Sequence, residues 1–94
     1  MEQATSEFLT FLDNLYLKFP ALFDSQLYLV GESYAGHYIP AYSVALNEAG
    51  KYNLKASIIG SPYTAGFTQN QEMYRVAEAA NILDESNMPQ VAAI

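Results

Sequence analysis

The first stretch of the chain carries apolar residues with the period of a helix. They recur at steps of three and four residues, which gathers them on one face of an amphipathic helix. The positions are Phe8, Phe11, Leu12, Leu15 and Phe19, with Leu9 and Tyr16 at the margins. The spacing predicts a helix over about residues 3–18 that ends near Phe19, because Pro20 disfavours helical geometry in the residue before it.

Two short apolar runs, with a helical segment between them, predict a strand, a helix and a second strand. The first run predicts a strand at about residues 26–31 and the second a strand at about 55–60. The segment 34–49 has apolar residues on one helical stripe, and Gly50 is suited to end that helix. Pro40 predicts a kink or a restart within it. Because a helix separates the strands, they should be parallel and covered on both faces.

The remainder of the chain is more polar and predicts further helices. A loop rich in turn residues occupies 60–66 and leaves the carboxyl edge of the second strand. Thr68 or Asn70 is a candidate N-cap for the next helix, whose end is expected at 84–87. Its apolar stripe consists of Met73, Val76, Ala77, Ala80 and Leu83. Pro89 suits the first position of one more helix.

Composition excludes several classes of protein. A net charge of −6 with only four Lys and Arg argues against nucleic-acid binding, which needs a basic surface. No run approaches the roughly 18 consecutive apolar residues of a membrane span. Cysteine is absent, and we find neither metal-ligand spacing nor a glycine-rich phosphate loop, so no metal or cofactor is expected. The N-terminus lacks the pattern of a secretory signal.

The segment GESYAG at residues 31–36 has the form of a nucleophile elbow. Such an elbow is a sharp turn from strand to helix that holds a serine in a strained conformation, and only small neighbours tolerate it. Gly31, Ala35 and Gly36 are small enough, although Ala35 stands where the general pattern G-x-S-x-G has its second glycine. The alternative is a simple strand-to-helix turn in which Ser33 has no chemical role.

The longer string GESYAGHYIP, residues 31–40, resembles the active-site segment of the serine carboxypeptidases, the family of carboxypeptidase Y and cathepsin A. The resemblance extends to the pairs FL at 8–9 and FP at 19–20, and to NLK at 53–55 and IG at 59–60. It departs from the family at residues 61–66, where Ser61-Pro62 and Ala65-Gly66 replace the usual Gly-Asn-Gly and Asp-Pro.

The resemblance implies an α/β fold, a fragment of the α/β-hydrolase fold with a central parallel βαβ unit and flanking helices. We expect residues 1–94 to form a partial domain. Residues 1–66 would hold the first helix and the βαβ core, and 67–94 the helices that lead toward the cap region. The remainder of the hydrolase would complete the sheet.

The resemblance also implies roles for three adjacent residues. Ser33 would be the nucleophile, and the backbone N–H of Tyr34 would donate a hydrogen bond to the oxyanion. Glu32 would bind the C-terminal carboxylate of a peptide as a protonated donor, which works best in acid. In the family, the triad Asp and His lie far downstream of this segment.

His37 is the only histidine, and we interpret it as structural or solvent-facing. A residue one turn into a helix lies back along the helix side, whereas an elbow serine projects above the strand edge. Asp13, Asp24 and Asp84 follow no later strand of the expected sheet, so they are interpreted as solvated or capping residues. The segment therefore contains no base for Ser33.

These observations favour part of an acid serine carboxypeptidase, which releases C-terminal residues of peptides or proteins through an acyl-enzyme. Two alternatives stay open: a carboxypeptidase-like acyltransferase, and a catalytically silent relative that binds a partner. The resemblance implies a vacuolar, lysosomal or secreted location. We expect the isolated chain to be inactive and only partly folded, since two parallel strands leave much apolar sheet uncovered.

Overall fold

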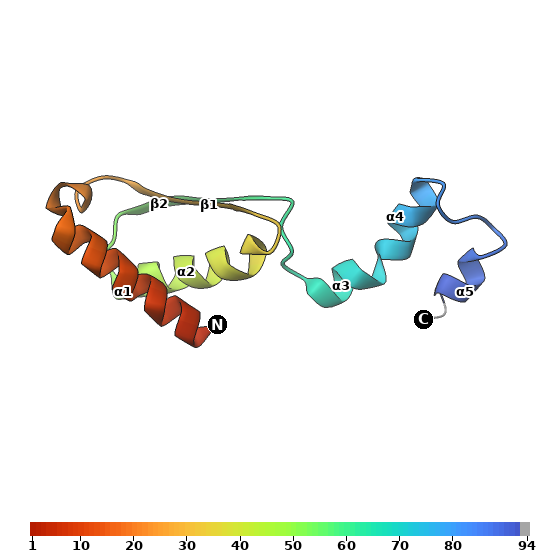
Figure 1. Cartoon of the computed structure of the whole chain (residues 1–94), viewed down its shortest axis with the longest axis horizontal. Helices are drawn as coiled ribbons and strands as arrows, with labels where there is room; N and C mark the ends of the chain where they lie inside the picture. Colours follow the sequence, from red (N-terminus) through yellow and green to blue (C-terminus); the bar gives the residue numbers. More distant parts are fainter. Residues whose placement is uncertain (93–94) are drawn as a thin grey trace. The chain divides into compact units, whose positions relative to one another are not determined.

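The computed structural model describes residues 1–92 and divides the chain into two compact units, Met1–Thr64 and Ala65–Ile94 (Figure 1). The first unit contains α1 (Glu2–Lys18), the short 3-10 helix η1 (Pro20–Leu22), β1 (Leu27–Glu32), α2 (Ala35–Ala49) and β2 (Leu54–Gly60). The second contains α3 (Gly66–Gln71), α4 (Met73–Ala79) and α5 (Met88–Ala92). Among the helices of residues 1–92, none combines the length and the apolar content needed to cross a lipid bilayer.

The two strands pair in parallel, which confirms the predicted βαβ unit. Val30 of β1 lies opposite Ile58 of β2, and Glu32 lies opposite Gly60. The carboxyl ends of both strands therefore reach the same edge of the sheet, where Ser33 follows β1 directly. That edge is where open parallel sheets bind their ligands.

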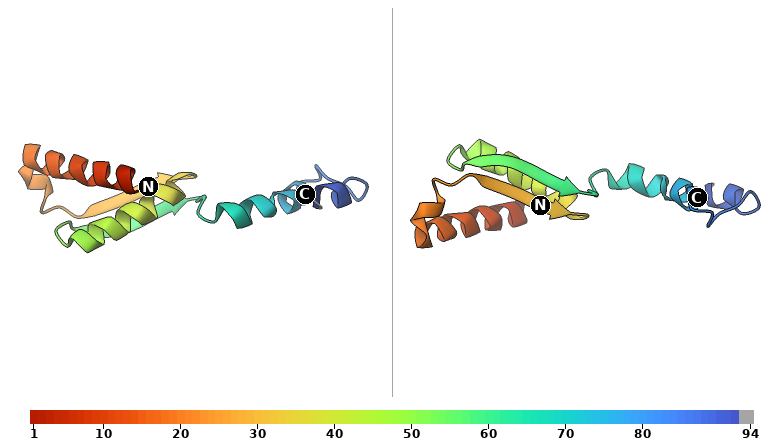
Figure 2. Two further views of the ribbon diagram at one scale, coloured as in Figure 1. Left: turned by 90° about the horizontal axis from the view of Figure 1, so that it is seen from below. Right: turned by 90° about the horizontal axis from the view of Figure 1, so that it is seen from above.

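Both long helices of the first unit lie on the same face of the sheet (Figures 1 and 2). The buried core between these layers consists of Leu12 from α1, Leu29 from β1, and Ile39 and Leu46 from α2. The most buried of them, Leu46, keeps 1% of its surface exposed. Apolar burial at these positions is what holds helices and sheet together.

The opposite face of the sheet is exposed within the described residues. Tyr28, Val30 and Ile58 point away from the helices, with 48%, 70% and 55% of their surfaces accessible. The expectation that both faces are covered is therefore met on one face only, because both helices of this unit pack on the same side. The strand residues alternate between core and solvent as the pleat requires.

The ends of the first two helices follow the sequence rules. α1 ends at Lys18, and Phe19 before Pro20 adopts a non-helical φ of −130° and ψ of 73°. α2 ends at Ala49 and is capped by Gly50, whose φ of 67° is the left-handed conformation that glycine accepts without penalty.

Of the kink or restart predicted at Pro40, the restart is wrong, because α2 runs unbroken through this residue, and the kink stays a prediction. A proline within a helix costs about 3 kcal/mol. Burial of a large aliphatic side chain contributes about 1.5–3 kcal/mol. Ile39 and Leu46 flank the proline in sequence and are both buried, so packing against the sheet outweighs the local penalty.

The second unit corrects two predictions. Thr68 and Asn70 lie inside α3 and are not N-caps; the Gln69 side chain instead accepts a hydrogen bond from the Ala65 N–H at 2.9 Å. α4 ends at Ala79, before the predicted end at residues 84–87, and Asn81 has a left-handed φ of 58° that stops helical geometry.

Asp84 has the capping role expected for it. Its carboxylate accepts hydrogen bonds from the backbone N–H groups of Ser86 and Asn87, just before α5 begins at Met88. The Ser86 hydroxyl also donates to this carboxylate. This bond first, and then the backbone bonds, lower the pKa of the Asp84 carboxyl. Pro89 is thus the second residue of α5, one position later than predicted.

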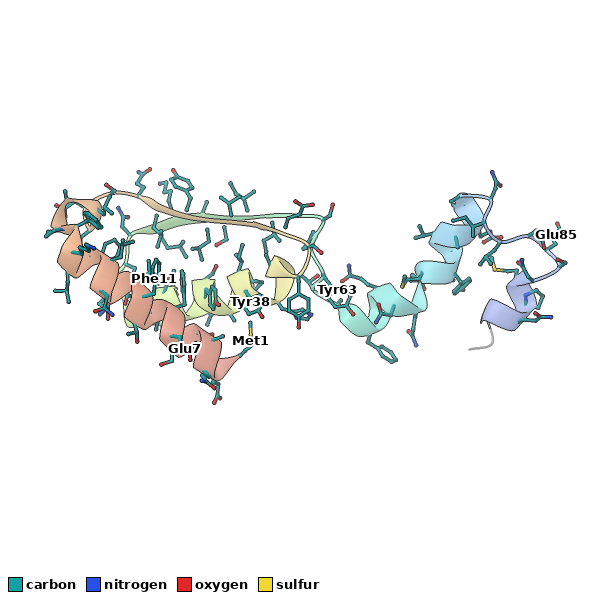
Figure 3. All side chains as sticks on the ribbon, in the orientation of Figure 1. Met1, Glu7, Phe11, Tyr38, Tyr63 and Glu85 are labelled. Atoms are coloured by element: carbon teal, nitrogen blue, oxygen red, sulfur yellow. The ribbon has the colours of Figure 1, made fainter. Side chains whose placement is uncertain are left out.

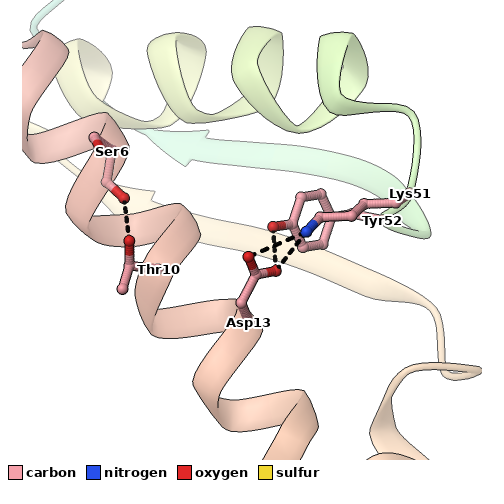
Figure 4. Close-up of polar contacts among 5 residues, drawn as sticks. All are labelled: Ser6, Thr10, Asp13, Lys51 and Tyr52. Carbon is pink, nitrogen blue, oxygen red and sulfur yellow. Dashed lines mark hydrogen bonds and ion pairs between the residues drawn. The ribbon is translucent and has the colours of Figure 1, made fainter.

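One polar cluster joins α1 to the segment between α2 and β2 (Figure 4). The Tyr52 hydroxyl donates to Asp13 Oδ1 at 2.5 Å, and Lys51 Nζ lies 3.0 Å from the same oxygen. Hydrogen bonds from Tyr52 and then Lys51 hold the pKa of Asp13 below its ordinary value. Burial and the bond to Asp13 raise the pKa of Tyr52. The interpretation of Asp13 as merely solvated or capping is therefore wrong.

Replacement of this carboxylate should reduce stability in a pH-dependent way. Because the folded-state pKa of Asp13 is depressed, its contribution is present above about pH 4, the ordinary pKa of an aspartate, and is lost as pH falls through the depressed value. In the full-length protein, Asp13→Asn should lower the thermal unfolding midpoint at pH 6, and the difference from wild type should narrow below about pH 4. Asp24→Asn, at an exposed position, is the control and should change little. A constant difference across this pH range would contradict the assignment.

Candidate active site at the carboxyl edge of the sheet

Ser33 occupies the corner between β1 and α2 in a strained backbone conformation. Its φ is 56°, in the left-handed region that a residue with a side chain rarely adopts. Such a conformation persists only where the surrounding structure enforces it. The Ser33 side chain is exposed at this corner, as the elbow pattern predicts.

The last residue of β2 and the loop after it hold the Ser33 backbone on both sides. The Ser33 N–H donates to the carbonyl of Gly60 at 3.0 Å, and the Tyr63 N–H donates to the Ser33 carbonyl at 2.8 Å. The Gly36 N–H donates to the same carbonyl at 3.0 Å. Three backbone hydrogen bonds therefore fix the strained residue, and two of them come from a segment far along the chain.

The small residues around Ser33 make this arrangement possible. A Cβ atom added to Gly31 would lie 2.5 Å from the Cβ of Ala35, so the strand and the helix could not meet as closely. A Cβ added to Gly36 would lie 2.8 Å from the Tyr63 backbone nitrogen and oxygen. Gly31 and Gly36 thus permit two separate close approaches. Ala35 fits because its single methyl group fills the space beside Gly31.

Tyr34 and Glu32 flank the serine in sequence, and both are exposed. Within the described residues the Tyr34 N–H makes no backbone hydrogen bond, so it is available to an oxygen placed above the corner. Glu32 ends β1 beside an open hollow between the two strand ends, lined by Val30, Gly31, Glu32, Ile58, Gly60 and Ser61. A hydroxyl, an N–H donor and a carboxyl group are therefore gathered at one edge.

His37 does not join Ser33. Its half-buried ring packs against Tyr34, with centroids 4.8 Å apart, and against the edge of Tyr63 at 5.3 Å. Figure 3 labels Tyr63, which lies at the N-terminal end of α2. Within residues 1–92, no group of three or more His, Cys, Asp or Glu side chains could hold a metal ion.

The sequence reasoning missed Tyr63. Its backbone contact with Ser33 depends on the parallel pairing of β1 and β2, which no local pattern around residue 63 encodes. The one available signal was topological, because the loop over 60–66 leaves the same sheet edge as Ser33. A parallel βαβ unit with a serine at this corner defines the α/β-hydrolase class.

Comparison with known proteins identifies a family within the α/β-hydrolase class. A family model described as serine carboxypeptidase matches residues 1–94. The pheromone-processing carboxypeptidase KEX1 of Saccharomyces cerevisiae is 35% identical over 95 residues, which cover 93% of this chain and 13% of KEX1. Carboxypeptidase Y homolog A of Talaromyces marneffei is 34% identical over 90 residues, covering 88% and 16%. Serine carboxypeptidase-like 41 of Arabidopsis thaliana is 42% identical over 67 residues, covering 65% and 14%.

The chain belongs to the serine carboxypeptidase family, and its architecture is that of part of an α/β-hydrolase fold. It spans between 13% and 16% of the length of these three relatives.

Two glycines at this edge offer a matched test of the close approach. In the full-length protein, Gly36→Ala should lower the thermal unfolding midpoint clearly, because the added Cβ would lie 2.8 Å from the Tyr63 backbone, which would have to shift. Gly60→Ala is the control, since its added Cβ would meet no atom closer than 3.9 Å. Equal effects of the two substitutions on the unfolding midpoint would contradict the close packing of Gly36 against the Tyr63 backbone.

Proposed function

We propose that this segment supplies the nucleophile and part of the substrate site of a serine-type carboxypeptidase. The observation that carries the proposal is the exposed Ser33 at a left-handed strand-to-helix corner, in a chain that belongs to this family. Residues 1–94 would form part of the α/β-hydrolase domain, with residues 67–94 leading toward its cap region. The remainder of that domain would be the partner of this segment.

In the proposed reaction, Ser33 Oγ attacks the carbonyl carbon of the last peptide bond of a substrate. Its proton passes to a histidine outside this segment, since His37 packs against Tyr34 and Tyr63. The negative charge that forms on the carbonyl oxygen is stabilised by the Tyr34 N–H and a second donor from elsewhere in the domain. The C-terminal amino acid leaves, and water hydrolyses the acyl-enzyme.

Glu32 is the proposed recognition group for the substrate's C-terminal carboxylate. It lies next to Ser33 and beside the hollow between the strand ends. An ionised Glu32 would repel a carboxylate, whereas a protonated one donates a hydrogen bond to it. Binding should therefore be favoured in acid. We propose a vacuolar, lysosomal or secreted location for the protein, and the first two compartments are acidic.

Replacement of Ser33 tests the proposed nucleophile directly. In the full-length protein, Ser33→Ala should reduce release of C-terminal amino acids by about 10⁴-fold or more, because no other group can form the acyl-enzyme. Ser25→Ala, an exposed serine at the other end of β1, is the control and should keep full activity. The unfolding midpoint should be unchanged in both variants. Turnover by Ser33→Ala at the wild-type rate would remove Ser33 from the mechanism.

The same assay separates the proposed peptidase from the two alternatives. A carboxypeptidase-like acyltransferase would pass the acyl group to an added alcohol in preference to water, and ester product would exceed free acid. A silent relative would show neither product, even with intact Ser33.

Replacement of Glu32 tests recognition of the substrate's C-terminus. For wild type, KM for a peptide with a free C-terminus should rise as pH increases, because the proposed recognition requires a protonated carboxyl group at residue 32. Glu32→Gln should raise KM in acid and remove this pH dependence, since an amide donates without taking up a proton. A C-terminally amidated peptide is the control and should respond little to the substitution. An unchanged pH profile of KM in Glu32→Gln would exclude the proposed role.

A further inference from the structure

Three aromatic rings at the corner contact one another, and the Tyr34 ring also lies 5.5 Å from the ring of Tyr38. The Tyr34 and His37 rings lie 4.8 Å apart, His37 meets the edge of Tyr63 at 5.3 Å and an interplanar angle of 75°, and Tyr34 stacks near Tyr63 at 6.2 Å. We call these three residues the ring cluster. All three distances fall in the range at which aromatic rings attract one another.

Each member of the ring cluster comes from a different part of the candidate site. Tyr34 follows Ser33 and carries the proposed oxyanion donor, His37 stands in the first turn of α2, and Tyr63 belongs to the loop after β2. The His37 N–H also donates to the Tyr34 carbonyl at 2.9 Å, so ring and backbone of His37 both contact Tyr34. The His37 ring thus contacts both the corner, through Tyr34, and the loop, through Tyr63.

The loop in turn holds Ser33. The Tyr63 N–H donates to the Ser33 carbonyl at 2.8 Å, and the Tyr63 backbone packs directly on Gly36. Displacement of Tyr63 would lengthen that hydrogen bond and release the left-handed conformation of Ser33. A ring that keeps Tyr63 in place therefore affects where the Ser33 hydroxyl and the Tyr34 N–H point.

We propose that His37 is a positioning residue, which through its ring contacts with Tyr34 and Tyr63 holds the Ser33 hydroxyl and the Tyr34 N–H in their reactive geometry. This inference rests on the proposed function. His37 transfers no proton in this role. The role requires only a flat ring of the right size at residue 37. An angular error at the nucleophile or the oxyanion donor slows the chemical step more than it weakens substrate binding.

The test compares substitutions that keep or remove the ring, in the full-length protein. His37→Ala should lower kcat on a blocked dipeptide by about tenfold with KM within about twofold, whereas His37→Phe should stay within about threefold of the wild-type kcat. The second readout is the rate at which a phosphonofluoridate modifies Ser33 with loss of fluoride, which should fall in parallel with kcat. Unfolding midpoints measured alongside identify any loss that comes from unfolding.

Tyr63→Ala is the second variant, and it keeps the proposal testable if His37→Ala is unstable. Tyr63→Ala removes a ring but keeps the backbone N–H that holds Ser33, and it should lower kcat to a similar degree. If the rings act as one unit, His37→Ala should cost much less in the Tyr63→Ala background than in wild type. Additive losses would overturn the inference.

The remaining outcomes are also decisive. If wild type reacts with the phosphonofluoridate and His37→Ala reacts equally fast, this inference fails while the proposed function stands. If His37→Phe loses as much activity as His37→Ala, the imidazole nitrogens matter and the positioning role is wrong. If wild-type protein neither hydrolyses peptides nor reacts with the probe, the proposed function and this inference fail together.

Discussion

The structure around the candidate site depends on the hydrogen bonds that hold the backbone of Ser33. A left-handed conformation costs a residue with a side chain about 1–2 kcal/mol. The bonds from Ser33 to Gly60 and from Tyr63 to Ser33 offset that cost at about 0.5–1.5 kcal/mol each. Both partners belong to the end of β2 or the loop after it. The corner therefore keeps its shape only where β1 and β2 pair in parallel and in register.

That pairing in turn depends on a small core. Four buried side chains, from α1, β1 and α2, join the helices to one face of the sheet. The polar cluster of Asp13, Lys51 and Tyr52 also connects α1 to the segment between α2 and β2. On the other face, Val30 and Ile58 expose apolar surface within the described residues. The conformation of the corner at Ser33 thus depends on apolar side chains buried between the helices and the sheet.

Sequence reasoning predicted the first unit well because its signals are local and agree with one another. The periodicity of α1, the apolar runs of β1 and β2, and the glycine after α2 all point to the same elements. It failed where two local effects compete. At Pro40 burial of the neighbouring side chains outweighs the proline penalty, and at Asn81 a left-handed residue ends a helix that the apolar stripe alone would continue.

The departure from the family pattern after β2 leaves the support of Ser33 intact, for a reason that the backbone explains. The groups that hold Ser33 are the carbonyl of Gly60 and the N–H of Tyr63, and neither depends on a side chain. Pro62 lacks an N–H, yet the donor that the corner needs is one residue later. Ser61 makes the turn with a φ of 41°, in place of the glycine usual in such conformations. The two contacts that hold Ser33 are therefore made by backbone groups, and the side chains of residues 61–66 do not enter them.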